Sequence, residues 1–194
     1  DGNFLAARAD GLANMGAFLS TVGPNVQAGN IFKNMPGVYK TPVIAVTTKC
    51  LFTNTTPIGA YRGAGRPEVG FAMERAVDLV ANHLDLDPAE VRFRNMIPPE
   101  DLPYNVGLTY RDGVPMVYDS GDYPKALTRA LDELGGLDGI RARQKQALAE
   151  GRYLGLGMGC YVEGTGVGPF EGATVKIDPT GKIMVATGAC PQGQ

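Results

Sequence analysis

A glycine-rich decapeptide has the residue types needed to bind an anionic ligand: Gly59-Ala60-Tyr61-Arg62-Gly63-Ala64-Gly65-Arg66-Pro67-Glu68. It follows a strand-like run and precedes a helical pattern, so its glycines would let the backbone approach a ligand at a helix N-terminus. Arg62 and Arg66 add guanidinium donors of fixed geometry. The spacing matches neither G-x-G-x-x-G nor a phosphate-binding Gly-Lys-Ser/Thr loop. The segment is either an anion or cofactor contact, or a strand-to-helix turn with surface arginines.

Two later glycine-rich segments could also contact a ligand. Gly155-x-Gly157-x-Gly159, followed by Gly164–Pro169, indicates either close packing against a neighbouring sheet or a ligand-shaped loop. Pro191-Gln192-Gly193-Gln194 follows an apolar run, and its two glutamines could offer donors and acceptors to a polar cofactor. Glu163 is a single carboxylate between glycines, which is too little to assign a catalytic base.

Other catalytic and metal chemistry finds little support. His83 is the only histidine and is expected near a helix C-terminus, where it has a structural role. Cys50, Cys160 and Cys190 are widely spaced and form no C-x-x-C motif, so they are expected to be small buried hydrophobic residues in a reducing compartment. A protein-ligated zinc or iron–sulfur site and a Ser–His–Asp or Cys–His arrangement are therefore excluded.

The elements that would position the decapeptide are a strand before it and two helices after it. Pro42–Phe52 is β-branched and apolar and predicts a strand. Glu68–Leu84 predicts a helix, because apolar residues recur on one face. A second helix should begin after Asp87, with Asp87 as the cap, Pro88 at the first position and Glu90 in a capping-box position, and end by Ile97. Residues 3–10 are only weakly strand-like, and 21–25 predict a turn.

The second half predicts helices followed by strands. Residues 98–121 predict an irregular connection with a hairpin near Asp112-Gly113, and residues 122–134 and 137–151 predict helices. Period-two patterns begin near residue 153, and a turn at 178–181 separates strands at 173–177 and 182–187. We therefore expect an α+β fold, with mixed or antiparallel sheets and helices packed on them in two lobes, 1–121 and 122–194. The best internal boundary lies near Gly151.

A basic stretch on the last predicted helix has two readings. Arg141, Arg143, Lys145 and Arg152 could bind a phosphate or a partner. Alternatively, they form a solvated helix face that Asp138 and Glu150 balance, which is the interpretation we favour.

Composition narrows the class of protein. The chain has 194 residues, 44% of them hydrophobic, a net charge of −2, and 27 Gly with 14 Pro, which predicts a globular protein with many tight turns. The acidic balance argues against a nucleic-acid or anionic-membrane surface, and no apolar run is long enough to span a bilayer. The chain begins Asp1-Gly2-Asn3 without a signal-like segment and stops after an apolar run, so we expect an excised piece of a larger cytoplasmic protein.

The glycine-rich segments, taken in this order, resemble the molybdenum-cofactor subunit of the molybdenum hydroxylases. That family includes xanthine dehydrogenase, aldehyde oxidase and aerobic carbon monoxide dehydrogenase. The resemblance covers essentially the whole chain. It is strongest at four segments: Gly59–Glu68, Glu74–Asp78, Asp87–Asn95 and Pro191–Gln194.

The resemblance implies specific site residues. In the family an A-[FY]-R-G-x-G loop lies beside the molybdenum, so Arg62 and Gly63 would contact the cofactor and Ala64 would line the substrate pocket. A later G-Q-G touches the pterin, and Gly193 and Gln194 match it. Copper-containing carbon monoxide oxidisers carry Cys in the sequence A-Y-R-C-S-F-R, whereas this chain has Gly63 there, so copper is not supported. Ala64 in place of an aromatic residue also weakens a purine-oxidising interpretation.

The resemblance also implies a reaction and partners. The family hydroxylates a carbon centre of an aldehyde, N-heterocycle or CO-like small molecule, with water as the oxygen source. Its cofactor is molybdopterin with molybdenum, here expected in the cytosine dinucleotide form, and electrons leave through iron–sulfur and FAD domains or subunits. The family's catalytic glutamate belongs to a motif far downstream of Gln194. We therefore expect no catalytic residue, no bound cofactor and no turnover in this chain alone.

Two other function classes remain open from the sequence. The chain could be a non-catalytic scaffold or binding fragment that holds no cofactor by itself. It could also be a nucleotide-binding module, as the glycine runs taken alone would allow. Molybdenum analysis of the full-length protein separates the first alternative from the enzyme, and binding of ATP or NAD would favour the second.

Overall fold

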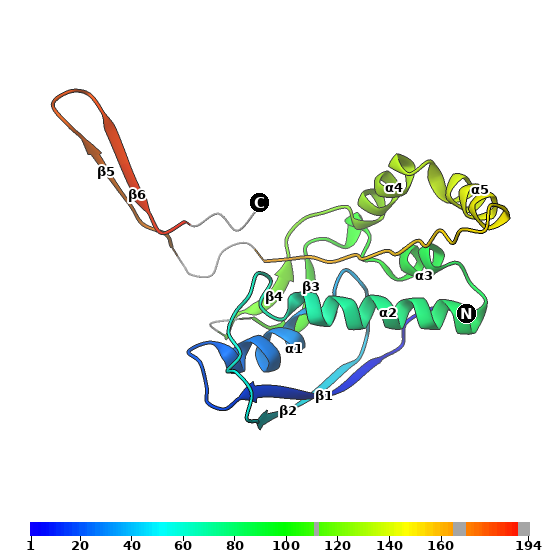
Figure 1. Ribbon diagram of the computed structural model, residues 1–194, viewed down its shortest axis with the longest axis horizontal. Coiled ribbons are helices and arrows are strands. Elements are labelled where there is room, and N and C mark those ends of the chain that lie inside the picture. Colours follow the sequence, from blue (N-terminus) through cyan, green and yellow to red (C-terminus); the bar gives the residue numbers. More distant parts are fainter. Residues whose placement is uncertain (111–112, 165–169, 190–194) are drawn as a thin grey trace. The chain divides into compact units, whose positions relative to one another are not determined.

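The computed structural model describes residues 1–110, 113–164 and 170–189 (Figure 1). The chain divides into two compact units, Asp1–Val162 and Glu163–Gln194. No helix within the described ranges has the length and apolar character needed to cross a membrane. The α+β class expected from the sequence is confirmed, because helices pack on small parallel and antiparallel sheets.

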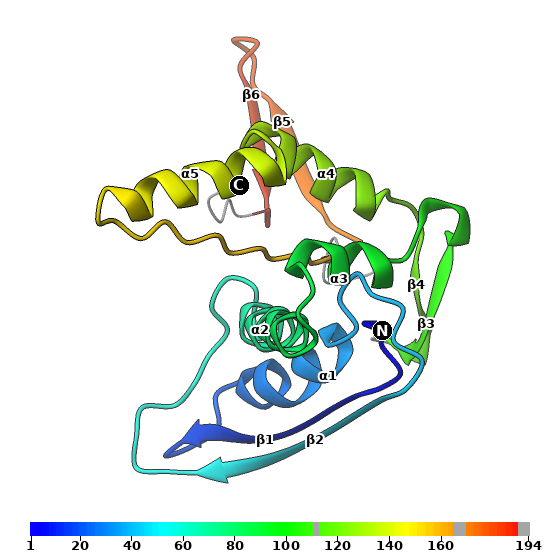
Figure 2. The ribbon, with the colours of Figure 1, turned by 90° about the vertical axis from the view of Figure 1, so that its right-hand side faces the viewer.

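The first unit begins with a parallel two-stranded ribbon. β1 (Ala7–Gly16) pairs with β2 (Ile44–Phe52), Ala7 opposite Ile44 and Gly16 opposite Phe52. The link between the strands contains a π-helical turn, η1 (Asn25–Asn30), and the short helix α1 (Ile31–Asn34). The strand predicted at 42–52 is confirmed, but the turn predicted at 21–25 leads into two helical segments that the sequence did not indicate. Figure 2 shows α1 and α2 on one face of the ribbon.

The two predicted central helices are confirmed as α2 (Arg66–Leu84) and α3 (Pro88–Asn95). Asp87 caps α3, since its Oδ1 accepts a hydrogen bond of 2.7 Å from the backbone N–H of Ala89, and Pro88 takes the first helical position. Glu90 departs from the capping-box expectation, because its carboxylate pairs with Arg94 one turn further along the helix.

A hairpin and two further helices follow. A 3₁₀ turn, η2 (Pro99–Asp101), precedes β3 (Tyr104–Thr109), which pairs antiparallel with β4 (Pro115–Tyr118). This confirms the predicted hairpin, although Asp112 lies outside the described residues. The predicted helices at 122–134 and 137–151 are observed as α4 (Tyr123–Glu133) and α5 (Gly136–Ala149). Asp122 caps α4, accepting a hydrogen bond of 3.0 Å from the N–H of Lys125.

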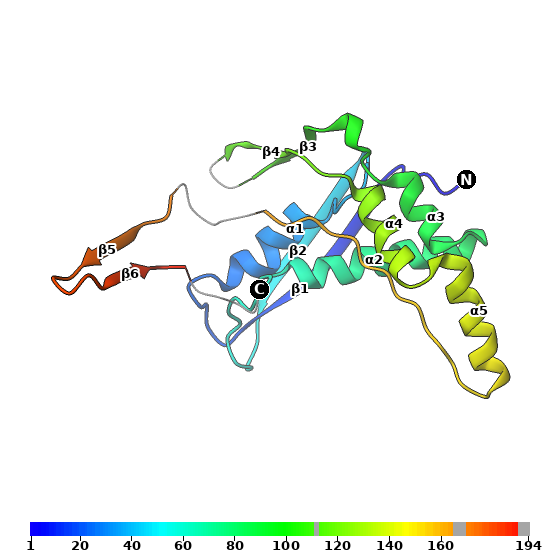
Figure 3. The same cartoon turned by 90° about the horizontal axis from the view of Figure 1, so that it is seen from above.

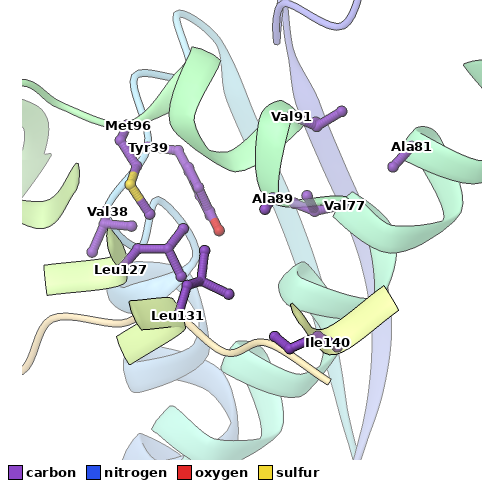
Figure 4. Close-up of a cluster of buried hydrophobic side chains, with 10 residues drawn as sticks. All are labelled: Val38, Tyr39, Val77, Ala81, Ala89, Val91, Met96, Leu127, Leu131 and Ile140. Carbon is purple, nitrogen blue, oxygen red and sulfur yellow. The ribbon is translucent and has the colours of Figure 1, made fainter. Parts of the chain in front are cut away.

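The main core joins the central helices to α4 and α5. Figure 4 shows Leu127 and Leu131 of α4 beside Val38 and Tyr39, which lie in the link between α1 and β2. The remaining buried members come mostly from α2, α3 and α5: Val77, Ala81, Ala89, Val91, Met96 and Ile140. Because α4 and α5 contribute to this core, they belong to the first unit. The structure therefore divides between residues 162 and 163, later than the boundaries expected at 121 and near Gly151.

A buried arginine lies at the centre of the helical layer. Arg92 of α3 is fully buried, and its guanidinium makes five hydrogen bonds of 2.9–3.2 Å. Two reach the carboxylates of Glu74 and Asp78 on α2. The other three reach backbone carbonyls, those of Pro88, Glu74 and Met158. A guanidinium has five N–H donors, and each of them has an acceptor in this buried cluster.

Tyr39 completes this cluster. Its hydroxyl donates a 2.6 Å hydrogen bond to Oε1 of Glu74, whose other oxygen accepts from Arg92. Burial, and then the nearby Glu74 charge, raise the pKa of Tyr39, so this hydroxyl stays protonated and remains a donor. Burial by itself would lower the pKa of Arg92, but the nearby Glu74 and Tyr39 and the hydrogen bonds that Arg92 donates to Glu74 and Asp78 outweigh it and raise that pKa.

The chain after α5 returns across the helices without forming a strand. Leu156, Met158, Cys160 and Val162 are half-buried against the main core, and the intervening residues are exposed. Figure 3 shows this segment doubling back from the end of α5. Burial alternates along this segment as the period-two pattern predicted, but the prediction that a strand begins at residue 153 is wrong. Side chains hold the segment in place of strand-to-strand backbone hydrogen bonds. Arg92 donates to the Met158 carbonyl, and the Gln144 amide donates to the Leu154 carbonyl.

The second unit is an antiparallel hairpin. β5 (Ala173–Ile177) pairs with β6 (Ile183–Thr187), Val175 opposite Val185 and Ile177 opposite Ile183, which confirms the predicted strands and their antiparallel arrangement. Asp178 closes the turn, accepting a 2.7 Å hydrogen bond from the N–H of Thr180. The register places the apolar pairs on one face of the ribbon.

Replacing Arg92 is expected to destabilise the protein strongly. Arg92→Ala leaves the buried Glu74 carboxylate without its partner and should lower the free energy of unfolding by about 3–5 kcal/mol. Arg92→Lys should also destabilise, because an ammonium has three donors where five are used. Arg94→Ala is the matched control on the same helix, and its partly exposed pair with Glu90 should cost no more than about 1 kcal/mol. Urea unfolding measures all three, and equal losses for Arg92→Ala and Arg94→Ala would contradict the assignment.

Candidate functional site

The decapeptide forms a tight loop with three successive residues in the left-handed region. Gly63, Ala64 and Gly65 have φ values of +91°, +47° and +97°. Two short-range hydrogen bonds close the loop: Ala64 N–H donates to the Tyr61 carbonyl at 2.7 Å, and Arg66 N–H donates to the Gly63 carbonyl at 3.1 Å. Gly65 then serves as the N-cap residue of α2. The chain therefore turns sharply over Gly63–Gly65 and enters α2 directly afterwards.

Glycine is required at the last of these positions for two reasons. An added Cβ at Gly65 would lie 2.1 Å from the Val26 carbonyl oxygen of η1, a backbone atom that cannot swing away. The φ of +97° is also unfavourable for any residue with a Cβ. Gly59 differs, since a Cβ there would meet nothing within 4 Å. The loop is thus packed tightly at its helical end and open at its strand end.

The segment between β1 and α1 contacts the loop region through two side-chain hydrogen bonds. The Ser20 hydroxyl donates to the Ile58 carbonyl, and the side-chain amide of Asn30 donates to the Ala64 carbonyl at 2.7 Å. Asn30 is itself buried, with 5% of its surface exposed. Sequence reasoning did not identify these residues, because they lie more than thirty positions before their partners and follow no recognised motif.

The loop presents Tyr61 and Arg62 outward. Both side chains are exposed, and Tyr61 retains 86% of its surface accessibility. Ala64 is half-buried. Arg66 is also half-buried, and its Nη1 donates to the Gly63 carbonyl at 3.2 Å, so it contributes to holding the loop. The arrangement places one exposed guanidinium close to the positive end of the α2 dipole, which favours an anionic ligand.

The remaining sequence candidates fall in different places. Gly193 and Gln194 lie outside the described residues, as do Pro191, Gln192 and positions 165–169. Gly155, Gly157 and Gly159 lie on the outward side of the extended segment, with open space where a Cβ would be. His83 is exposed in the last turn of α2. Of the cofactor and substrate residues expected from the sequence, Arg62, Gly63 and Ala64 therefore lie together in the described loop.

The basic stretch on α5 is engaged in local pairs. Arg141 pairs with Asp87 at 2.7 Å, Arg143 donates to the Leu134 carbonyl at 2.6 Å, and Arg152 pairs with Glu150. These contacts favour the solvated-face interpretation over a phosphate site. The sequence predicted that Asp138 and Glu150 balance these basic residues. Glu150 does so by pairing with Arg152, whereas Arg141 pairs with Asp87 and not with Asp138.

Cys160 is the one described cysteine that lies in a polar cluster. Burial, and then the charge of nearby Glu74, raise the pKa of its thiol to about 11. A thiol with so high a pKa is a poor nucleophile at neutral pH. Cys50 is exposed on β2. No group of three or more His, Cys, Asp or Glu side chains that could hold a metal ion occurs among the residues described.

Comparison with known proteins identifies the family. Residues 1–96 match a family model of the molybdopterin cofactor-binding domain, and residues 130–194 match a second model with the same description. The chain therefore belongs to the molybdopterin cofactor-binding family, and the resemblance stated from the sequence is confirmed.

Particular relatives agree with this assignment. The chain is 34% identical, over its whole length and 24% of the relative, to the 6-hydroxypseudooxynicotine dehydrogenase complex subunit gamma of Paenarthrobacter nicotinovorans. It is 33% identical, again over its whole length and 26% of the relative, to the carbon monoxide dehydrogenase large chain of Afipia carboxidovorans. The crystal structure of quinoline 2-oxidoreductase from Pseudomonas putida 86 matches all of this chain and 25% of that one, with a TM-score of 0.78 and 36% identity. The chain thus spans about a quarter of the length of these relatives.

Adding a methyl group at Gly65 should disrupt the loop. Gly65→Ala combines an unfavourable φ with a backbone clash, and we expect a loss of about 2–5 kcal/mol in the free energy of unfolding. Gly59→Ala is the matched control and should change it by no more than about 0.5 kcal/mol. Denaturant unfolding of both variants provides the measurement. A neutral Gly65→Ala would show that the loop does not pack on η1 as described.

Thiol labelling should distinguish the two described cysteines. In a Cys190→Ser background at pH 8, Cys50 should react with iodoacetamide at least about tenfold faster than Cys160, because less of the Cys160 thiol is ionised and it is partly buried. The difference should disappear in 6 M guanidinium chloride, about the concentration that unfolds most proteins. Peptide mass spectrometry follows each site. Equal native rates would refute the raised pKa.

Proposed function

We propose that this chain is part of a molybdopterin-dependent oxidoreductase that hydroxylates a carbon centre, and that its Tyr61–Gly65 loop contacts the cofactor. The observation that carries the proposal is the loop itself: consecutive left-handed residues turn the backbone sharply between exposed Arg62 and the N-terminus of α2. In this proposal Arg62 and Gly63 bind the cofactor and Ala64 borders the substrate. Gly193 and Gln194 are assigned a second cofactor contact by the family resemblance.

The residues present fit such a group. Molybdopterin is anionic through its phosphate, and an exposed guanidinium beside a helix N-terminus is suited to an anion. The described residues offer no side-chain ligand set for a metal, so a metal held at this loop has to bring ligands of its own, as a metal–pterin cofactor does. When bound, the cofactor supplies the redox centre that accepts two electrons as a carbon–hydrogen bond is replaced by a carbon–oxygen bond from water.

The chain's own residues have binding and orienting roles. The Arg62 guanidinium can stabilise negative charge that develops on a substrate oxygen. Ala64 has a small side chain and leaves space beside the loop for a substrate. Gly63 has no thiol, which argues against copper at this position. An aldehyde or an N-heterocycle is therefore a better substrate class than carbon monoxide, and relatives named for quinoline and 6-hydroxypseudooxynicotine support this choice.

The larger assembly follows from the family. By family resemblance we assign residues 1–121 to the first part of the molybdopterin-binding region and 122–194 to a helical linker and the start of a second subdomain, a sequence division that differs from the compact unit ending at Val162. The separate family matches at 1–96 and 130–194 support this division. Several relatives are named as subunits or large chains, which supports partner subunits for this chain. The family resemblance assigns iron–sulfur and FAD subunits or domains as these partners, and we propose a cytoplasmic location. The cofactor is assigned the cytosine dinucleotide form.

Metal and cofactor analysis of the full-length protein tests the proposal directly. The full reading frame, produced with its partner subunits, should contain about one molybdenum per chain and release a pterin cytosine dinucleotide on denaturation. Absence of molybdenum and pterin from a folded, complete assembly would favour the scaffold alternative instead.

Arg62 should be needed for turnover. In the molybdenum-loaded full-length enzyme, Arg62→Ala should lower kcat by about 10²–10³, the usual cost of losing one donor to a developing oxyanion. Arg62→Lys should also lose activity, because a point charge does not reproduce the planar fork. Arg66→Ala should have a smaller effect, since Arg66 turns back onto the Gly63 carbonyl. Steady-state kinetics with parallel molybdenum analysis decides this, and wild-type turnover by a fully loaded Arg62→Ala enzyme removes Arg62 from the site.

A further inference from the structure

The loop that carries Arg62 is held by a buried amide whose partner lies far away in the sequence. Asn30 is the last residue of the π-helical turn η1, and its Nδ2 donates to the Ala64 carbonyl at 2.7 Å. The side chain is almost fully buried, so this hydrogen bond is shielded from competing water. The backbone carbonyl of Asn30 in turn accepts a 2.7 Å hydrogen bond from the Asn34 amide. Asn30 thus connects the helical segment directly to the middle of the loop.

The backbone of η1 meets the loop at the next residue. Val26 presents its carbonyl oxygen to Gly65, and the Cβ of Asn30 would be 3.3 Å from a Cβ placed there. A π-helical turn is a rare conformation that often occurs at functional sites. Here both Val26 and Asn30, which lie within this turn, are buried and touch the loop. The contact is therefore made by two residues of one helical turn, one through its backbone and one through its side chain.

Ala64 is the residue that most needs such support. Its φ of +47° is unfavourable for a residue with a Cβ, whereas the glycines on either side adopt positive φ at little cost. If Ala64 relaxed to a right-handed conformation, its peptide plane would rotate and its carbonyl would leave Asn30. A hydrogen bond to that carbonyl therefore opposes the relaxation directly.

We infer that Asn30 is a positioning residue for the cofactor loop: its amide keeps Ala64 left-handed and thereby fixes the directions of the Arg62 and Ala64 side chains. This inference rests on the proposed function for the role of those two side chains. The conformational part concerns only this chain's residues and can be tested separately. Asparagine suits the position because its amide donates, whereas an aspartate of the same shape presents only acceptor oxygens to the carbonyl.

Hydrogen exchange of the full-length protein tests the conformational part. Asn30→Asp should accelerate exchange of the Ala64 and Arg66 amides about tenfold, the factor expected for losing one buried hydrogen bond. Asn25→Asp is the matched control: it makes the same chemical change in the same turn η1, at an exposed residue that makes no described side-chain hydrogen bond to the loop, and it should leave these two rates unchanged. If Asn30→Asp does not fold, Asn30→Ala removes the donor without adding repulsion and replaces it.

A second variant separates positioning from simple space filling. Ala64→Gly allows the left-handed conformation without strain, so adding it to Asn30→Asp should return the exchange rates to within about twofold of wild type. Unchanged exchange in Asn30→Asp, or no rescue by Ala64→Gly, overturns the inference.

Kinetics of the molybdenum-loaded enzyme tests the functional part. Asn30→Asp should lower kcat about tenfold or more with unchanged molybdenum content, whereas Asn25→Asp, which adds the same charge to an exposed position of η1, should leave kcat unchanged, so that the loss follows the hydrogen bond to the loop. If exchange behaves as expected but kcat is unchanged in both Asn30→Asp and Arg62→Ala, the loop is positioned by Asn30 yet the proposed function of the loop fails. If kcat falls in Arg62→Ala and not in Asn30→Asp, the positioning role is overturned and the proposed function stands.

Discussion

The buried guanidinium of Arg92 organises the first unit. A cation withdrawn from water is tolerated only when its donors are satisfied and its charge is balanced. Arg92 meets both conditions through two carboxylates on α2 and three backbone carbonyls. The acceptors lie on α2, on the first turn of α3 and on the segment after α5, so Arg92 joins these three parts of the chain at one point. Two motifs that identified the family, Glu74–Asp78 and Asp87–Asn95, are the two sides of this cluster.

The candidate site depends on the same frame through α2. Arg92 fixes the middle of α2, and the loop with Arg62 enters the helix at its N-terminus. Asn95, near the other end of α3, accepts from the Phe4 N–H at 2.7 Å and donates to the Gly2 carbonyl at 2.7 Å. These contacts anchor the chain just before β1, whose continuation into η1 supports the loop. Both elements that contact the loop, α2 and the segment that leads from β1 into η1, are therefore tied to α3, α2 through Arg92 and the start of the chain through Asn95.

Local signals predicted most of the regular elements but not their long-range partners. Apolar periodicity located the helices from α2 onward and Asp87 marked the start of α3, because these signals act within one or two turns. The parallel pairing of β1 with β2 was not predicted, since the residues of β1 are mostly small or polar. The segment after α5 shows the limit of periodicity: alternating burial requires only one packed face, and a strand also requires a neighbour with free hydrogen-bonding groups.

The same distinction applies to the site. The glycines and arginines at 59–68 were recognised because their types and spacing already suggest an anion contact. Asn30 could not be recognised, because a lone asparagine carries no indication of a carbonyl 34 positions later. Gly65 illustrates a mixed case: its type indicates conformational freedom, but only the packed structure shows that the Val26 carbonyl occupies the space of its missing side chain.

The hydrogen bond from Arg92 to the Met158 carbonyl also has a mechanical consequence. Tension applied to the chain from the direction of Glu163 reaches Met158 before it reaches α5 or α4. The residues beyond Met158 are held by half-buried apolar contacts and by the Cys160 thiol, which hydrogen-bonds with Tyr39 and Arg92. Separation of Met158 itself then leaves a donor of the buried Arg92 guanidinium without its carbonyl. The Arg92–Met158 hydrogen bond therefore resists a force applied through the connecting segment before that force is transmitted to α4 and α5.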